Sequence, residues 1–235
     1  VSFSYGDTTA LKNISFEAKR GQTIGIIGPT GSGKSSLVNL ICRFYDATEG
    51  EIYIDNIPIK DLNIKHLRSS IGMAMQDIFL FSDTIEGNIA YGCPSVSLEQ
   101  IKDIAKLSEA HNFISEMPEG YDTIVGERGV GLSGGQRQRI SLARALITNP
   151  SILILDDTTS AVDMETEFKI QQEVNLNNPN RTNFIIAHRI SSVKSADLIL
   201  VLENGRIIES GTHDSLVKNK GYYYEVYKTQ FGDFN

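Results

Sequence analysis

The feature that most constrains the fold is a glycine-rich segment between an apolar run and an amphipathic run. Residues 28–35 read Gly-Pro-Thr-Gly-Ser-Gly-Lys-Ser and follow the apolar run TIGII directly. Gly28, Gly31 and Gly33 let a backbone turn sharply and aim its N–H groups inward. The helical pattern that follows adds the positive end of its dipole. Strand, loop and helix in this order predict a phosphate-binding loop.

The residue types in this loop predict how it would hold ATP and Mg²⁺. Lys34 is expected to reach the β and γ phosphates, and the Ser35 hydroxyl to ligate Mg²⁺. The other loop positions are expected to contact the nucleotide as well: Pro29, Thr30, Ser32 and Ser36. A chance glycine-rich turn is the alternative, and the strand and helix on either side weigh against it.

A second segment, SILILDD at 151–157, is an apolar strand that ends in two carboxylates. Asp156 is expected to hold Mg²⁺ through water, and Asp157 stands where a base would polarise the attacking water. An acidic pair standing alone after a strand is more often a helix cap. Beside a phosphate loop, we favour ATP hydrolysis.

The remaining pattern predicts an α/β fold. Strand-like runs recur at 14–18, 23–27, 51–54, 152–155, 184–187 and 198–202. Several are unbroken rather than alternating, which is typical of parallel strands covered on both faces. Asn204-Gly205 predicts a tight hairpin that closes the sheet with an antiparallel edge.

Between these strand runs the sequence predicts helices. Ser97 and Gln100 have capping-box spacing at the start of a helix over about 97–117. Another helix should follow Ser133 and stop before Pro150. We therefore predict one domain with a core of 1–76 and 146–235, interrupted by a helical lobe of about 77–145.

Composition excludes several classes of protein. The net charge of −7 argues against a sequence-independent grip on nucleic acid. Cys42 and Cys93 are too few for a disulfide framework or a four-ligand zinc site, and fit a reducing compartment. No apolar run approaches the roughly 20 residues of a membrane span. The chain begins inside a predicted strand without Met, so we expect it to be part of a longer polypeptide.

Residues 132–136, Leu-Ser-Gly-Gly-Gln, open the predicted helix after Ser133. Together with the loop at 28–35, Asp156 and His188, they resemble the nucleotide-binding domain of ABC transporters over essentially the whole chain. The resemblance implies a P-loop NTPase (RecA-like) core with a mainly parallel sheet, an antiparallel β subdomain and an inserted α-helical subdomain. It also implies that Ser133, Gly134, Gly135 and Gln136 present a helix start to ATP held by a second nucleotide-binding domain.

Further positions match the family in order. The resemblance implies that Tyr5 stacks on adenine and that Gln76 senses Mg²⁺ and the attacking water. It places Asp163 in a loop that crosses the dimer interface, and makes His188 the switch histidine that contacts the γ phosphate. Each residue taken singly has an ordinary alternative: a core-edge tyrosine, a solvated glutamine, a helix cap and a hydrogen-bonded histidine.

Two segments resemble the exporter branch of the family. Residues 79–85, followed by Asn88 and Ile89, resemble a stretch that packs against transmembrane coupling helices, and so do residues 123–129 with Glu127. Both could be ordinary surface loops. The resemblance implies a transmembrane domain earlier in the polypeptide and a place at the cytoplasmic face of the cell membrane.

One residue departs from the family pattern. The usual residue after the Mg²⁺-binding aspartate is Glu, whereas Asp157 is one methylene shorter. Losing a well-placed base costs about 10² to 10⁴ in rate. We therefore hypothesise an impaired site within a heterodimeric exporter. The alternative is a homodimer whose backbone has shifted to let Asp157 reach.

Two other functional classes share parts of this pattern. ATP-gated clamps on DNA or ribosomes need coiled-coil insertions or basic linkers, and the sequence has neither. A regulatory module would bind ATP without turning it over, and single-turnover hydrolysis distinguishes it from an ATPase.

Overall fold

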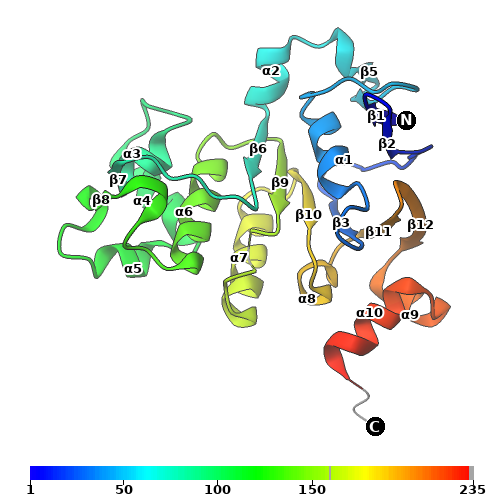
Figure 1. Cartoon of the computed structure of the whole chain (residues 1–235). Helices are drawn as coiled ribbons and strands as arrows, with labels where there is room; N and C mark the ends of the chain where they lie inside the picture. Colours follow the sequence, from blue (N-terminus) through cyan, green and yellow to red (C-terminus); the bar gives the residue numbers. More distant parts are fainter. Residues whose placement is uncertain (159, 233–235) are drawn as a thin grey trace. The chain divides into compact units, whose positions relative to one another are not determined.

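The computed structural model describes residues 1–158 and 160–232, except for the side chain of Glu127. These residues form two compact units (Figure 1). The first unit is Val1–Ile71 with Thr182–Asn235, and the second is Gly72–Arg181. The lobe expected at 77–145 falls inside the second unit, and its boundaries stay a prediction. Among the described helices, none has the length and apolar character needed to cross a bilayer.

The first unit is built on strands in the order β12-β11-β3-β10. Their bounds are β3 Thr23–Ile27, β10 Thr182–Ile186, β11 Leu198–Glu203 and β12 Arg206–Gly211. β3 runs parallel to both of its neighbours, and all five of its residues are buried, which explains its unbroken apolar run. β12 pairs antiparallel with β11 around the turn at Asn204 and Gly205, both at positive φ. The predicted hairpin and antiparallel edge are confirmed.

Short hairpins and helices complete the first unit. Two antiparallel hairpins pair β1 Phe3–Tyr5 with β2 Thr8–Leu11, and β4 Tyr53–Ile54 with β5 Ile57–Pro58. The helices are α1 Lys34–Ile41, η1 Ile59–Asp61, α2 Ile64–Ser69, α8 Ile190–Val193, α9 His213–Asn219 and α10 Tyr222–Phe231.

Two strand predictions in this unit need correction. The strand expected at 14–18 is wrong, because that segment is irregular. Ile14 exchanges two backbone hydrogen bonds with Val1 and its side chain is buried, but no ladder continues from that pair. Burial of single apolar side chains therefore produced the strand-like pattern. The strand expected at 51–54 is shorter than predicted and covers only Tyr53–Ile54.

The second unit is mostly helical. Its helices are α3 Ile85–Ala90, α4 Leu98–Leu107, α5 His111–Ser115, η2 Gly120–Asp122, η3 Glu127–Gly129, α6 Gly134–Leu146 and α7 Met164–Asn177. Its strands are β6 Ile71–Ala74, β9 Ile152–Asp156, and the antiparallel pair β7 Asp83–Thr84 with β8 Ile124–Val125. α3 and α4 pack on α6 around Ile89, Ile101 and Ile140, which are fully buried. The capping box at Ser97 and the helix after Ser133 are confirmed. The single helix expected over 97–117 is wrong, because α4 ends at Leu107 and α5 begins at His111.

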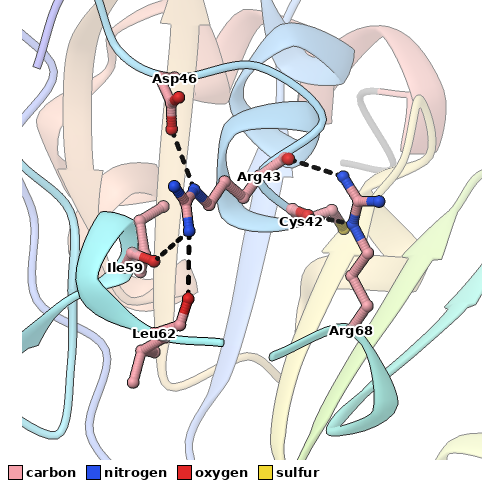
Figure 2. A network of polar contacts seen from close by, with 6 residues as sticks. All are labelled: Cys42, Arg43, Asp46, Ile59, Leu62 and Arg68. Carbon is pink, nitrogen blue, oxygen red and sulfur yellow. Dashed lines mark hydrogen bonds and ion pairs between the residues drawn. The ribbon is translucent and has the colours of Figure 1, made fainter. Parts of the chain in front are cut away.

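Two arginines hold the C-terminal end of α1, the helix that follows the glycine-rich loop (Figure 2). Arg43 Nη1 donates to the carbonyls of Ile59 (3.1 Å) and Leu62 (3.2 Å). Arg68 Nε donates to the carbonyl of Cys42 (3.3 Å), and Arg68 Nη2 to that of Arg43 (2.8 Å). The last carbonyls of a helix lack intrahelical partners and favour nearby positive charge. The two side chains therefore fasten α1 to η1 and α2.

Candidate functional site

The loop at 28–33 can only be built with glycine at two of its positions. Gly28 lies at φ +155°, and a Cβ there would overlap the carbonyl of Leu202. Gly33 lies at φ +105°, and a Cβ there would lie 2.7 Å from a methyl carbon of Leu11 and 2.9 Å from the carbonyl oxygen of Ala10. Gly31, at φ +78°, leaves open space around its Cβ position. The loop thus presents bare backbone on its open side.

Lys34 brings a positive charge back onto this loop. It is the first residue of α1 and is 7% exposed. Its Nζ donates to the carbonyls of Gly28 (2.8 Å) and Pro29 (2.9 Å). The ammonium is therefore held at the loop, where phosphate oxygens would be stronger acceptors than neutral carbonyls.

Ser32 provides a test of whether the loop fits a phosphate ligand. Its side chain is 2% exposed, and its buried Oγ has no hydrogen-bond partner among the described residues. A buried hydroxyl without a partner is costly, and a ligand oxygen would satisfy it. The donors available here are backbone N–H groups, an ammonium and hydroxyls, which is the set that suits the phosphates of ATP.

A cavity of about 410 Å³ lies against the loop. Its lining is shared by β2, the loop, the start of α1 and the β11–β12 turn, namely Thr8, Thr9, Ala10, Lys12, Gly31, Gly33, Lys34, Ser35, Ser36, Asn204 and Gly205. Gly205 N–H donates to the Ser32 carbonyl (3.0 Å) and joins the turn to the loop, and Lys12 N–H donates to the Gly205 carbonyl (2.7 Å) and joins the turn to the end of β2. The volume of the cavity suits a small-molecule ligand. Of the predicted loop contacts, Gly28, Pro29, Thr30 and Ser32 do not line it.

Tyr5 stands in β1 as a braced, partly exposed ring. Its centroid lies 4.6 Å from that of Phe3 and 5.1 Å from that of Tyr45, both in edge-to-face geometry. The ring is 41% exposed and does not line the cavity. Edge contacts leave aromatic surface available for stacking.

His188 is exposed and follows β10 in the first unit. Its carbonyl accepts a hydrogen bond from Gln230 Nε2 (2.7 Å), and Ile190 N–H donates to Gln230 Oε1 (2.8 Å). Sequence reasoning missed Gln230, because nothing local in the sequence connects the last helix with the segment after β10.

In the second unit, Ser133 opens α6 as predicted. Ser133 Oγ accepts from Gln136 N–H (3.2 Å), and Gln136 Oε1 accepts from Ser133 N–H (2.8 Å). This reciprocal capping box fixes the start of a 13-residue helix. The first N–H groups of a helix have no intrahelical partner, so this start can receive an anion.

Gln138 ties the start of α6 to the segment after β9. Its Nε2 lies 3.1 Å from Ser160 Oγ and 3.4 Å from the carbonyl oxygen of Asp157, and its Oε1 accepts from Ala161 N–H (2.9 Å). A Cβ on Gly135 would lie 2.9 Å from the Ala161 carbonyl oxygen, so glycine is required there. Neither Gln138 nor this packing was expected from the sequence.

The three aspartates that the sequence predicts for the site, Asp156, Asp157 and Asp163, lie in different local environments. Asp156 ends β9, and Asp157 follows at φ +47°. Left-handed backbone is adopted most readily by Gly, Asn and Asp. Asp163 caps α7 by accepting from Thr166 N–H (2.9 Å), and that bond lowers the pKa of its carboxyl. Asp163 therefore caps a helix, which is the ordinary alternative to a role at a dimer interface. Gln76 is exposed after β6.

The predicted coupling surface contains a cluster of aromatic rings. The rings of Phe79 and Phe81 are 5.1 Å apart, and Phe81 stacks on Tyr91 at 4.2 Å. Arg144 donates to the Phe79 carbonyl (2.7 Å) and lies over the Phe81 ring. Phe79 and Tyr91 are 49% and 60% exposed, an apolar patch of the kind that partners cover. The side chain of Glu127 lies outside the described residues.

The predicted site residues therefore fall into two groups. The first unit holds Tyr5, the loop at 28–36 and His188, and the second holds Gln76, residues 133–136, Asp156, Asp157 and Asp163. Of these, Gly31, Gly33, Lys34, Ser35 and Ser36 line one cavity. The helix start at Ser133 meets the segment after Asp157 through Gln138.

Comparison with known proteins places these features in a family context. A family model described as "ABC transporter" matches residues 11–160. The chain is 57% identical over 235 residues to an uncharacterized ABC transporter ATP-binding protein, YknU, of Bacillus subtilis, covering 99% of this chain and 40% of that protein. It is 49% identical over 232 residues to a putative multidrug export ATP-binding/permease protein of Staphylococcus aureus (strain NCTC 8325 / PS 47), covering 98% of this chain and 40% of that protein.

A solved structure with a similar fold also belongs to an ABC exporter. A bacterial Atm1-family ABC exporter with ATP bound superposes with a TM-score of 0.95 at 42% identity, over 100% of this chain and 41% of that chain. The chain thus spans about two fifths of the length of the proteins it matches. The predicted fold class is confirmed.

Proposed function

Because the chain belongs to the ABC transporter family, we propose that it is the ATP-hydrolysing motor domain of an exporter. The observation that carries this proposal is the loop after β3. Glycines that tolerate no side chain, a buried lysine on the loop carbonyls and a buried hydroxyl with no partner among the described residues all occur there. Such a set suits a triphosphate.

Each predicted residue has a definite task in this proposal. Bound Mg-ATP supplies the phosphoanhydride bond whose hydrolysis releases free energy. Lys34 exchanges the carbonyls of Gly28 and Pro29 for the β and γ phosphates. Ser35, Gln76 and Asp156 would hold Mg²⁺. Asp157 would take a proton from the attacking water, and His188 would contact the γ phosphate. Tyr5 offers its ring to adenine.

The helix start at Ser133 extends the proposal to a dimer. The first N–H groups of α6 have no partner within the helix, so a partner's γ phosphate can be received at this helix start. The nucleotide then lies between two nucleotide-binding domains and stabilises their pairing. We place the domain at the cytoplasmic face of the membrane, with the coupling helices of a transmembrane domain on the surface around Phe79. Nucleic acid is not an expected partner at a net charge of −7.

Asp157 carries the finer part of the proposal. Its left-handed backbone suits Asp, and its carboxylate is one methylene shorter than the family's usual Glu. We propose that the site built on Lys34 hydrolyses slowly and that a partner in a heterodimer does most of the work. The alternative is a homodimer in which a shift of the backbone at Asp157 brings the shorter carboxylate within reach of the attacking water.

Two variants in the full-length transporter test the proposed function. Lys34→Ala should lower ATP affinity at least about tenfold, because it removes the ammonium expected on the β and γ phosphates. Ser133→Arg should leave nucleotide binding by its own chain intact. It should lower the turnover of the complex between this variant and its unmodified partner by about 10². Ser133→Thr is the matched control, since threonine also caps helices.

The two measurements separate the parts of the proposal. Unchanged ATP affinity in Lys34→Ala would show that the loop does not bind ATP. Undiminished turnover in Ser133→Arg would show that the start of α6 does not contribute to the ATP site of a partner. Binding without single-turnover hydrolysis in the parent complex would instead favour a regulatory module.

A further inference from the structure

We propose that Gln230 is a positioning residue for His188. The inference rests on the proposed function, in which His188 contacts the γ phosphate. Gln230 does not touch the nucleotide in this proposal. It fixes the backbone from which the imidazole projects.

The side-chain amide of Gln230 uses both of its ends on one short segment. Its Nε2 donates to the carbonyl of His188 (2.7 Å), and its Oε1 accepts from Ile190 N–H (2.8 Å). Ile190 is the first residue of α8, and Arg189 at the N-cap position provides no side-chain cap. Gln230 therefore caps α8 from a different helix.

The helix that carries Gln230 is itself fixed at its other end. The Glu209 carboxylate accepts from the N–H groups of Tyr222 and Tyr223 at the start of α10. Tyr223 is fully buried, and its hydroxyl lies 2.8 Å from His213 Nδ1. α10 also packs against α8 and α9 (Figure 1). A helix held in this way delivers the Gln230 amide to a defined place about two turns further on.

This contact matters because the segment at His188 has left the sheet. β10 ends at Ile186, and α8 does not begin until Ile190. His188 is an exposed residue, so burial does little to fix the direction of its side chain. A reacting group displaced by about 1 Å can lose much of its effect on rate. The two hydrogen bonds of Gln230 hold the backbone on both sides of Arg189.

The test uses the full-length transporter assembled with its partner. Gln230→Ala is compared with Thr229→Ala, whose hydroxyl donates, within the described part of the chain, to the carbonyl of Glu225 in its own helix (2.8 Å). Gln230→Ala should lower kcat for ATP about fivefold and leave nucleotide affinity within about twofold, because two part-exposed neutral hydrogen bonds are lost away from the ligand. Amide exchange over residues 187–193 should become about fivefold faster. Thr229→Ala should change neither.

A second variant separates the two hydrogen bonds. Gln230→Glu keeps an acceptor for Ile190 N–H but cannot donate to the His188 carbonyl when ionised. Because its charged oxygen would also repel that carbonyl oxygen, its kcat should fall at least as far as that of Gln230→Ala. Because it keeps side-chain size, it also decides the question if the alanine variant does not assemble.

A His188→Ala background shows whether Gln230 acts through His188. There, adding Gln230→Ala should cause no further loss in single-turnover rate. An equal loss in both backgrounds, or unchanged kcat and exchange in Gln230→Ala, would overturn the inference. Failure of the proposed function would be seen separately, as unchanged ATP affinity in Lys34→Ala.

Discussion

Replacing Asp157 by Glu should raise turnover while lowering stability. The added methylene extends the carboxylate toward the position expected for the attacking water. A well-placed general base is worth about 10² to 10⁴ in rate. Asp157 retains part of that effect, so we expect a gain of at least about tenfold, or about 1.4 kcal/mol of barrier.

The same substitution should cost folding stability. Asp157 lies at φ +47°, where Asp is tolerated better than Glu. The extra strain is about 1 kcal/mol. For a domain of this size that corresponds to a melting temperature lower by about 2 to 4 °C. A faster enzyme that melts earlier cannot owe its gain to better folding.

The assay measures single-turnover ATP hydrolysis in complex with the native partner, with the partner's own phosphate-loop lysine replaced. Only the site built on Lys34 then contributes. Asp157→Asn is the matched control, since Asn also accepts left-handed backbone but provides no base. It should be slower than the parent.

Two results would refute this reasoning. If Asp157→Glu does not hydrolyse faster, the shorter carboxylate is not what limits the site, and the homodimer with a shifted backbone is favoured. If Asp157→Asn hydrolyses as fast as the parent, Asp157 is not the base.

Two further predictions concern the first unit. Arg68→Ala should destabilise the chain by about 1 kcal/mol, because the carbonyls of Cys42 and Arg43 lose their guanidinium donor; Arg68→Lys should restore only part of this, as a melting series will show. Burial, with the nearby charge of Lys194, lowers the pKa of His213 below its usual 6.5, so the unfolded chain binds the proton more readily. The stabilisation that comes from neutral His213 is complete above pH 6.5 and is lost as the pH drops below that value. On acidification the urea midpoint of His213→Gln should therefore fall less than that of the parent. Equal dependence of the two midpoints on pH would contradict the assignment.

Much of the site could be predicted from the sequence because its signals are local. The strand, glycine loop and helix at 23–41 are adjacent in the chain, and a glycine at positive φ is needed wherever the backbone must turn that way. The capping boxes at Ser97 and Ser133 span only three residues each, so their spacing alone predicts them. The hairpin at Asn204-Gly205 is equally local.

Other features depend on residues that are far apart in the sequence. Gln230 lies 42 residues from His188, and Gln138 lies 23 residues from Ala161. Gly28 must be glycine because the carbonyl of Leu202 lies against it, which no property of the loop reveals. The strand-like pattern at 14–18 failed for the same reason, since burial by distant residues imitates the alternation of a strand.

The sequence by itself determined the strand, glycine loop and helix at 23–41, the two capped helix starts and the α/β class, because periodicity, capping and turn chemistry act over a few residues. Only the tertiary structure decided which side chains hold these parts in place. Gln230 at His188, Gln138 beside Asp157 and Arg68 at the end of α1 each act through contacts that the packing of distant segments creates. Such contacts leave no periodic trace along the chain.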